Sequence, residues 1–131
     1  MLGLFPVAAT AADLTVYLTG LRNTNGYLRL SLYNRPETFL KADGRIARAK
    51  LAIEANPMIV QFTNLVPRSY AVSVHHDENG DGSLNRNLLG IPREGYGFSN
   101  DARPVLAPPS FSNAEVRVGL GGTTITITLR Y

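Results

Sequence analysis

Hydrophobic and polar residues alternate along most of the chain, and this period of two is typical of β-strands with one buried face. The clearest example is the last segment, in which Ile125, Ile127 and Leu129 alternate with threonines and Arg130. The same alternation marks six earlier segments: 14–19, 28–33, 47–54, 58–64, 70–74 and 115–118. The positions expected in the core are Val16, Leu18, Leu30, Leu32, Leu51, Ile53, Phe62, Val72, Val74, Val116, Ile125, Ile127 and Leu129.

Turn signals separate these segments. Asn25-Gly26 is a hairpin dipeptide, Asn56-Pro57 interrupts an extended run, and Gly119–Gly122 precedes the last strand. Residues 36–46 have room for one helical turn, and residues 91–112 show no periodicity and are expected to form a long loop. Seven short strands without an amphipathic helix predict an all-β fold, a seven-stranded antiparallel β-sandwich.

The chain has 131 residues, which suits one domain over residues 12–131. Residues 1–11 are apolar and small, and Ala9-Thr10-Ala11 matches a signal-peptidase site. We interpret them as the remnant of a truncated signal peptide; the alternative is a disordered or strand-extending leader. Export would place the mature protein in the bacterial periplasm or outside the cell.

Composition excludes several classes of function. Without cysteine the chain has no disulfide, no thiol nucleophile and no Cys-based zinc site. The net charge is +3, but the arginines are scattered, so we expect no nucleic-acid partner. No apolar run approaches the ~18 residues of a transmembrane segment. The sequence leaves the partner unknown, with a protein or small ligand in the periplasm as the two options.

An acidic loop follows the fifth predicted strand. Asp77, Asn79 and Asp81 occupy alternate positions, and Gly82 follows at once. This matches the first half of an EF-hand loop, in which oxygen ligands stand at positions 1, 3 and 5 before a glycine. The spacing predicts a Ca²⁺ site, although Asn-Gly and Asp-Gly are also ordinary turn dipeptides, so a solvated turn is the alternative.

The second half of the EF-hand pattern is incomplete. Ser83 can supply a carbonyl and Asn85 an amide oxygen, but Leu88 stands where a bidentate glutamate is needed. A carboxylate from elsewhere, Glu94 or Asp101, would have to complete the shell.

A binding surface is the second candidate site. It would consist of charged, aromatic and amide residues within one irregular stretch: Arg93, Tyr96, Phe98, Asn100 and Arg103. The alternative is a compact loop packed by its own side chains, with both aromatic rings turned inward.

Two neighbouring histidines precede the acidic loop. On a strand they point to opposite faces, which places His76 at the edge of the core and His75 outside. We expect His76 to make a structural hydrogen bond at the base of the loop, and His75 to be exposed.

The motifs HDENGDGSLN and LGIPREGYGFSN, which begin at His76 and Leu89, resemble those of a bacterial family of small exported proteins catalogued as a domain of unknown function. The resemblance implies a transthyretin-like (prealbumin-like) β-sandwich with an immunoglobulin-like Greek key, and no catalytic residues. One departure is Arg68, which stands where the family usually has a turn glycine.

Three functions are compatible with these observations. The first is an exported, non-catalytic β-sandwich module, structural or binding, that Ca²⁺ steadies. The second is a carrier of a small ligand, with its pocket at the 91–103 loop. The third is a hydrolase that uses Asp77, Glu94 or Asp101 with His75 or His76, although no G-x-S-x-G or H-E-x-x-H motif is present.

Overall fold

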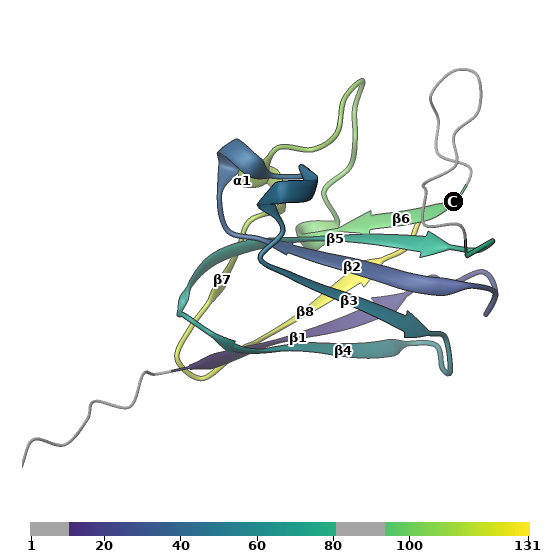
Figure 1. Ribbon diagram of the computed structural model, residues 1–131, viewed down its shortest axis with the longest axis horizontal. Helices are drawn as coiled ribbons and strands as arrows, with labels where there is room; N and C mark the ends of the chain where they lie inside the picture. Colours follow the sequence, from purple (N-terminus) through teal and green to yellow (C-terminus); the bar gives the residue numbers. More distant parts are fainter. Residues whose placement is uncertain (1–10, 81–93) are drawn as a thin grey trace, which may run out of the picture.

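The computed structural model describes residues 11–80 and 94–131, which form two β-sheets packed face to face (Figure 1). The first sheet has the strand order β4 (Met58–Leu65), β1 (Ala12–Thr19), β8 (Thr123–Thr128). The second has the order β3 (Ala47–Ala52), β2 (Tyr27–Tyr33), β5 (Arg68–Asp77), β6 (Gly95–Phe98), and β7 (Val116–Val118) pairs with the start of β5. The predicted all-β class is therefore confirmed.

Two details of the predicted architecture are wrong. The seven expected strands are present, but β6 is an additional strand within the expected 91–112 loop. The sheets are also not purely antiparallel, because β1 and β8 run parallel from Leu14↔Thr123 to Thr19↔Thr128. The first and last strands of the described chain thus lie side by side in one sheet and run in the same direction.

The core lies between the sheets and contains the inward positions of both. Leu18, Leu32 and Ile127 are fully buried. The predicted core positions are buried apart from Leu51 and Ile125, which are partly buried and pack against the cluster. The Tyr70 hydroxyl donates a hydrogen bond to the Val66 carbonyl at 2.6 Å and fixes the entry into β5.

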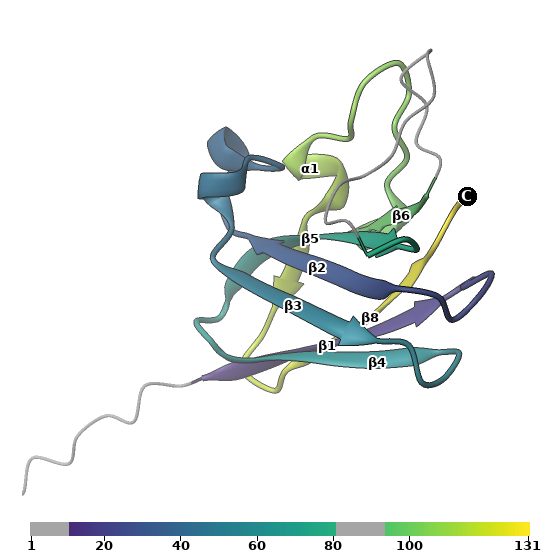
Figure 2. The ribbon, with the colours of Figure 1, turned by 45° about the vertical axis from the view of Figure 1, so that its right-hand side comes forward.

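Short helical turns cover one end of the outer face of the second sheet (Figure 2). They are η1 (Pro36–Thr38), η2 (Ala42–Gly44) and α1 (Phe111–Ala114), while η3 (Ser99–Asp101) lies beside α1 and the end of β8. Beneath them lies a second apolar cluster formed by Tyr33, Ala71, Phe111 and Ala114, with Phe39, Leu40, Phe98 and Ala102 against it. The rest of this outer face carries polar and charged side chains.

Two glycines allow β6 to lie close to the end of β8. A Cβ at Gly95 would lie 2.4 Å from the Tyr131 ring, and one at Gly97 would lie 2.7 Å from Cγ2 of Ile127. Both glycines therefore face inward, where the strand crosses the end of β8 too closely for a side chain. Tyr96 and Phe98 consequently lie on the other face of the strand, where Phe98 packs against the second apolar cluster.

Residues 99–101 connect β6 to its neighbours. The buried Ser99 hydroxyl accepts a hydrogen bond from the Val72 amide at 2.9 Å and donates to the Ala114 carbonyl. Asn100 donates to the carbonyls of Asn113 and Glu115. This turn therefore positions α1 against the sheet.

The signal-peptide prediction concerns residues 1–11, nearly all of them outside the described residues. Within the described residues, β1 begins at Ala12, which is 3% exposed. Among the residues described, no helix is long and apolar enough to cross a membrane.

Candidate metal centre

Three potential metal ligands meet on the outer face of the second sheet. His75 and Asp77 come from the end of β5, and Glu94 immediately precedes β6. One ligand atom from each lies within 4.8 Å of the other two. Ligands that share one ion bonded at 2.0–2.6 Å have such separations.

Strand geometry brings these residues together. His75 and Asp77 are two positions apart on β5 and therefore share a face, while His76 between them points into the core. The register pairs His75 with Tyr96 and His76 with Gly95, so the residue before Gly95 lies opposite Asp77. The hairpin between β5 and β6 thus sets the position of Glu94.

Asp77 is fully buried, and a cation from the neighbouring strand neutralises it. Its Oδ2 accepts a hydrogen bond from Nε of Arg29 at 2.8 Å. Arg29 lies on β2 directly opposite His75, and a third of its side chain is exposed. A buried carboxylate requires such a partner, because desolvation of an isolated charge costs several kcal/mol.

Glu94 is 5% exposed and uses both of its oxygens. Oε1 lies 3.0 Å from Nε2 of His75. Oε2 accepts hydrogen bonds from the backbone amides of Glu78 at 2.8 Å and Asn79 at 3.4 Å. Glu94 therefore caps the turn that begins the acidic loop and links it to His75.

Glu78 belongs to a different contact. Its carboxylate accepts hydrogen bonds from Arg22 at 2.6 Å and from Asn23 at 2.6 Å. Partial burial raises the pKa of Glu78, but the hydrogen bonds from Arg22 and Asn23 outweigh burial and hold that pKa below its ordinary value. This pair joins the acidic loop to the β1–β2 connection.

His76 has the structural role that the sequence predicts, but with different partners. It is fully buried, its Nε2 lies 2.8 Å from the Asn25 carbonyl, and its Nδ1 lies 2.5 Å from the Tyr131 hydroxyl. Burial raises the pKa of Tyr131. His76 therefore holds the β1–β2 connection and Tyr131 rather than the acidic loop. The hairpin predicted at Asn25-Gly26 is wrong, because β1 and β2 lie in different sheets and this turn crosses from one sheet to the other.

The structure brings some of the predicted calcium ligands together and separates others. Asp77 and Glu94 are in the cluster, and the Asn79 backbone lies beside it. Asp101 is outside this group; its Oδ1 accepts a hydrogen bond from the Thr128 amide at 2.8 Å. The predicted ligands Asp81, Ser83 and Asn85 lie outside the described residues.

The residues of the predicted ligand-binding surface have different surroundings in the structure, although the rings of Tyr96 and Phe98 are neighbours with centroids 6.1 Å apart. Tyr96 is half-buried beside His75, and Phe98 packs against the second apolar cluster. Asn100 holds α1, Arg103 is exposed, and Arg93 lies outside the described residues.

His75 is more buried than its sequence position predicts. Only 18% of its side chain is exposed, and its Nε2 contacts Glu94. The alternation of His75 and Asp77 on one strand face is the signal in the sequence that would have grouped them.

A basic hollow of about 400 Å³ adjoins the cluster on the same sheet face. Its charged lining comes from Arg29, Arg45, Arg48 and Lys50. Arg29 therefore belongs both to this hollow and to the Asp77 ion pair. A larger hollow lies between η1 and α1, and neither of the two is lined by residues 94–103.

The fold and the cluster define an all-β protein in which a histidine and two buried carboxylates meet where β5 and β6 join the acidic loop. The chain belongs to a bacterial family: the sequence model of the family described as an uncharacterized protein conserved in bacteria (DUF2141) matches residues 16–126. No curated protein and no solved structure matches the chain. The chemistry of the cluster therefore has to be inferred from its own geometry.

Proposed function

We propose that this chain is an exported, non-catalytic module that binds a divalent cation where β5 passes into the acidic loop. The fold proposed is a transthyretin-like β-sandwich with Greek-key connections, and the compartment is the periplasm or the exterior of a bacterium. The observation that carries the cation site is the convergence of His75, Asp77 and Glu94 within 4.8 Å.

The charges of the cluster support a cation. Two carboxylates are buried, and the cation paired with Asp77 is Arg29, a third of whose side chain is exposed. An ion at this point would be coordinated by carboxylate oxygens of Asp77 and Glu94 and by the imidazole nitrogen of His75. The acidic loop would add the oxygens of Asn79, Asp81, Ser83 and Asn85.

The donor atoms also bear on which ion binds. The spacing of the loop and its carboxylates favours Ca²⁺, which takes six to eight oxygens. An imidazole with two carboxylates instead suits Zn²⁺ or Mn²⁺. We propose Ca²⁺ because the acidic loop would contribute several oxygen donors, whereas His75 contributes one nitrogen. A substitution of His75 therefore distinguishes Ca²⁺ from Zn²⁺ or Mn²⁺.

Thermal unfolding tests the proposal. Without the position-12 glutamate, Kd for Ca²⁺ should be of order 10⁻⁴–10⁻³ M. At about ten times Kd, an ion that binds only the folded state stabilises it by ~1.4 kcal/mol, which raises Tm by a few degrees. Mg²⁺ should shift Tm less, because it requires shorter, octahedral bonds.

Four variants locate the site. Asp81→Ala and Glu94→Gln should each abolish the Ca²⁺ shift, whereas Asp101→Asn should retain it, since Asp101 is bonded to the Thr128 amide. His75→Gln should leave most of the Ca²⁺ shift intact and remove any response to Zn²⁺. Equal Tm values in EDTA and in millimolar Ca²⁺, Mn²⁺ and Zn²⁺ would refute the cation site altogether.

One observation favours a second candidate, a hydrolase. The 3.0 Å contact between His75 and Glu94 orients an imidazole, as a general base requires, and Asp77 lies beside it. This candidate predicts hydrolysis of activated esters that His75→Gln removes and that EDTA leaves unchanged. The carrier with its pocket at the 91–103 loop has less support, because Phe98 and Asn100 are engaged in packing.

A further inference from the structure

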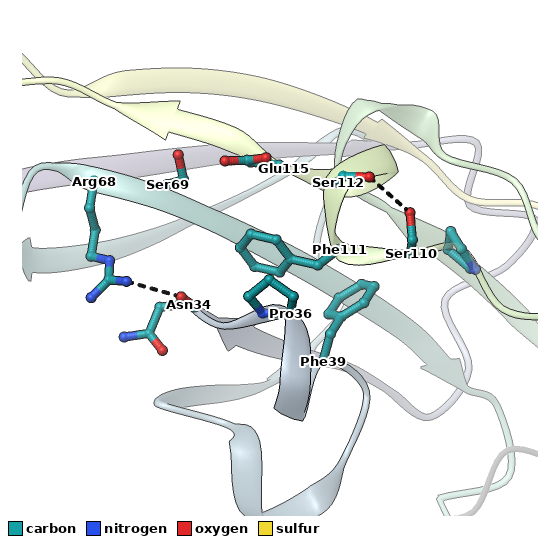
Figure 3. A pocket seen from close by; sticks show the side chains of 10 residues that line it. Asn34, Pro36, Phe39, Arg68, Ser69, Ser110, Phe111, Ser112 and Glu115 are labelled. Atoms are coloured by element: carbon teal, nitrogen blue, oxygen red, sulfur yellow. Dashed lines mark hydrogen bonds between the residues drawn. The ribbon is translucent and has the colours of Figure 1, made fainter.

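A hollow of about 540 Å³ lies between η1, the start of β5 and α1 (Figure 3). None of the residues that line it belongs to the cation cluster. Its floor is apolar and includes Pro36, Phe39 and Phe111. The rings of Phe39 and Phe111 meet edge to face, with centroids 5.9 Å apart. The volume is within the range of about 300–1,000 Å³ that is usual for small-molecule sites.

The floor is preformed because the rest of the fold holds it. Phe111 is 7% exposed and belongs to the second apolar cluster, and Phe39 also packs edge to face on Tyr33 at 5.2 Å. Ser110 caps α1 by accepting a hydrogen bond from the Asn113 amide at 3.2 Å. A ligand would therefore find the rings in place and would lose little free energy in ordering them.

One cation and one anion stand on the rim. Arg68 is exposed, and its only side-chain hydrogen bond within the described residues runs from Nη2 to the Asn34 carbonyl at 3.1 Å. The remaining guanidinium donors are available to a ligand. Glu115 is also exposed, and in the described part of the chain its carboxylate has no hydrogen bond or ion pair.

We propose that this hollow binds small monocarboxylates with a flat apolar body. The body lies on Pro36, Phe39 and Phe111, and the carboxylate accepts hydrogen bonds from Arg68, whose planar fork matches it. Glu115 repels a second negative charge, so the site selects monoanions over dianions. This site is independent of the cation cluster and does not require the proposed cation function.

The test is a titration of the ¹⁵N-labelled full chain with 3-phenylpropionate, followed by amide chemical shifts. Perturbations should concentrate at Phe39, Ser69 and Phe111, with Kd in the millimolar range because the ligand is small. Arg68→Gln should weaken binding about five- to tenfold, and Arg68→Lys should weaken it less. Arg48→Gln, an exposed arginine on β3 outside this hollow, is the matched control and should bind as the natural chain does.

Two further ligands test the charge selection. Phenylsuccinate, a dianion, should bind the natural chain more weakly than phenylpropionate does, and Glu115→Gln should reduce that difference. The uncharged 3-phenylpropanol should bind about tenfold more weakly than the acid. Equal binding of acid and alcohol, unchanged binding by a folded Arg68→Gln variant, or shifts located outside this hollow would each overturn the proposal.

Discussion

The ion pair between Arg29 and Asp77 gives the sharpest energetic prediction, because its two partners differ in burial. Asp77 is fully buried, whereas a third of the Arg29 side chain is exposed. Removing one partner of a buried ion pair costs about 3–5 kcal/mol when a buried charge is left behind. The two single variants should therefore differ in their effect on stability.

Arg29→Met keeps the length of the side chain and removes its charge, which leaves the Asp77 carboxylate buried without its guanidinium. We expect a loss of about 3 kcal/mol, at the lower end of the range, because a third of the Arg29 side chain is exposed and solvent can reach the vacated position. For a domain of this size the loss corresponds to a decrease in Tm of roughly 10 °C. Asp77→Asn leaves a solvated guanidinium and should cost only about 1–2 kcal/mol.

The measurement is urea unfolding followed by far-ultraviolet circular dichroism, in EDTA. Arg48→Met removes an exposed arginine on the neighbouring β3 and should change stability by less than about 0.5 kcal/mol. Added Ca²⁺ should stabilise Arg29→Met more than the natural chain, because the ion replaces the missing positive charge. If Arg29→Met and Asp77→Asn had equal, small effects, Asp77 would not depend on this partner, and the electrostatic reasoning would be wrong.

Three other predictions follow from the packing and from the loop contacts. Ile127→Ala should cost roughly 2–5 kcal/mol in urea unfolding, since Ile127 is fully buried; a loss below 1 kcal/mol would contradict its place in the core. Gly97→Val should prevent β6 from pairing, because a Cβ at this position would lie 2.7 Å from Ile127. Hydrogen exchange at the Phe98 amide should then become faster. Gly119→Ala is the control and should change nothing, because a Cβ there meets open space. The lowered pKa of Glu78 means that its carboxylate stabilises the folded state. This stabilisation is complete above the ordinary carboxyl pKa and is lost as pH falls through the pKa of the folded state. Glu78→Gln should therefore flatten that part of the stability–pH curve.

Alternation predicted most of the fold because inward and outward positions differ in chemistry along each strand. The segment ending in Ile125, Ile127 and Leu129 is an example, since threonine and arginine fill its outward positions. In β6 the same rule fails, because the inward positions are Gly95 and Gly97 and carry no side chain to reveal the period. Alternation also could not predict the parallel pairing of β1 with β8, since it specifies which face of a strand is buried and not which strand pairs with it.

The candidate site was predictable only in part, because some of its residues are brought together by strand pairing and not by local spacing. The acidic spacing after β5 identified Asp77, and the need for a remote carboxylate identified Glu94 as one of two options. The choice of Glu94 over Asp101 depends on the β5–β6 register, which no local pattern encodes. Arg29 was missed for the same reason, because its position opposite His75 is a property of strand pairing.

The most direct test of the cation site is a crystal structure of the full chain grown with Ca²⁺, and with Mn²⁺ in a second crystal for its anomalous signal. The account predicts one ion bound by carboxylate oxygens of Asp77 and Glu94 at about 2.3–2.6 Å for Ca²⁺, with oxygens of the acidic loop completing the shell. It would be contradicted by a cluster that stays empty at saturating ion, with the Arg29–Asp77 and His75–Glu94 contacts unchanged at 2.8 and 3.0 Å.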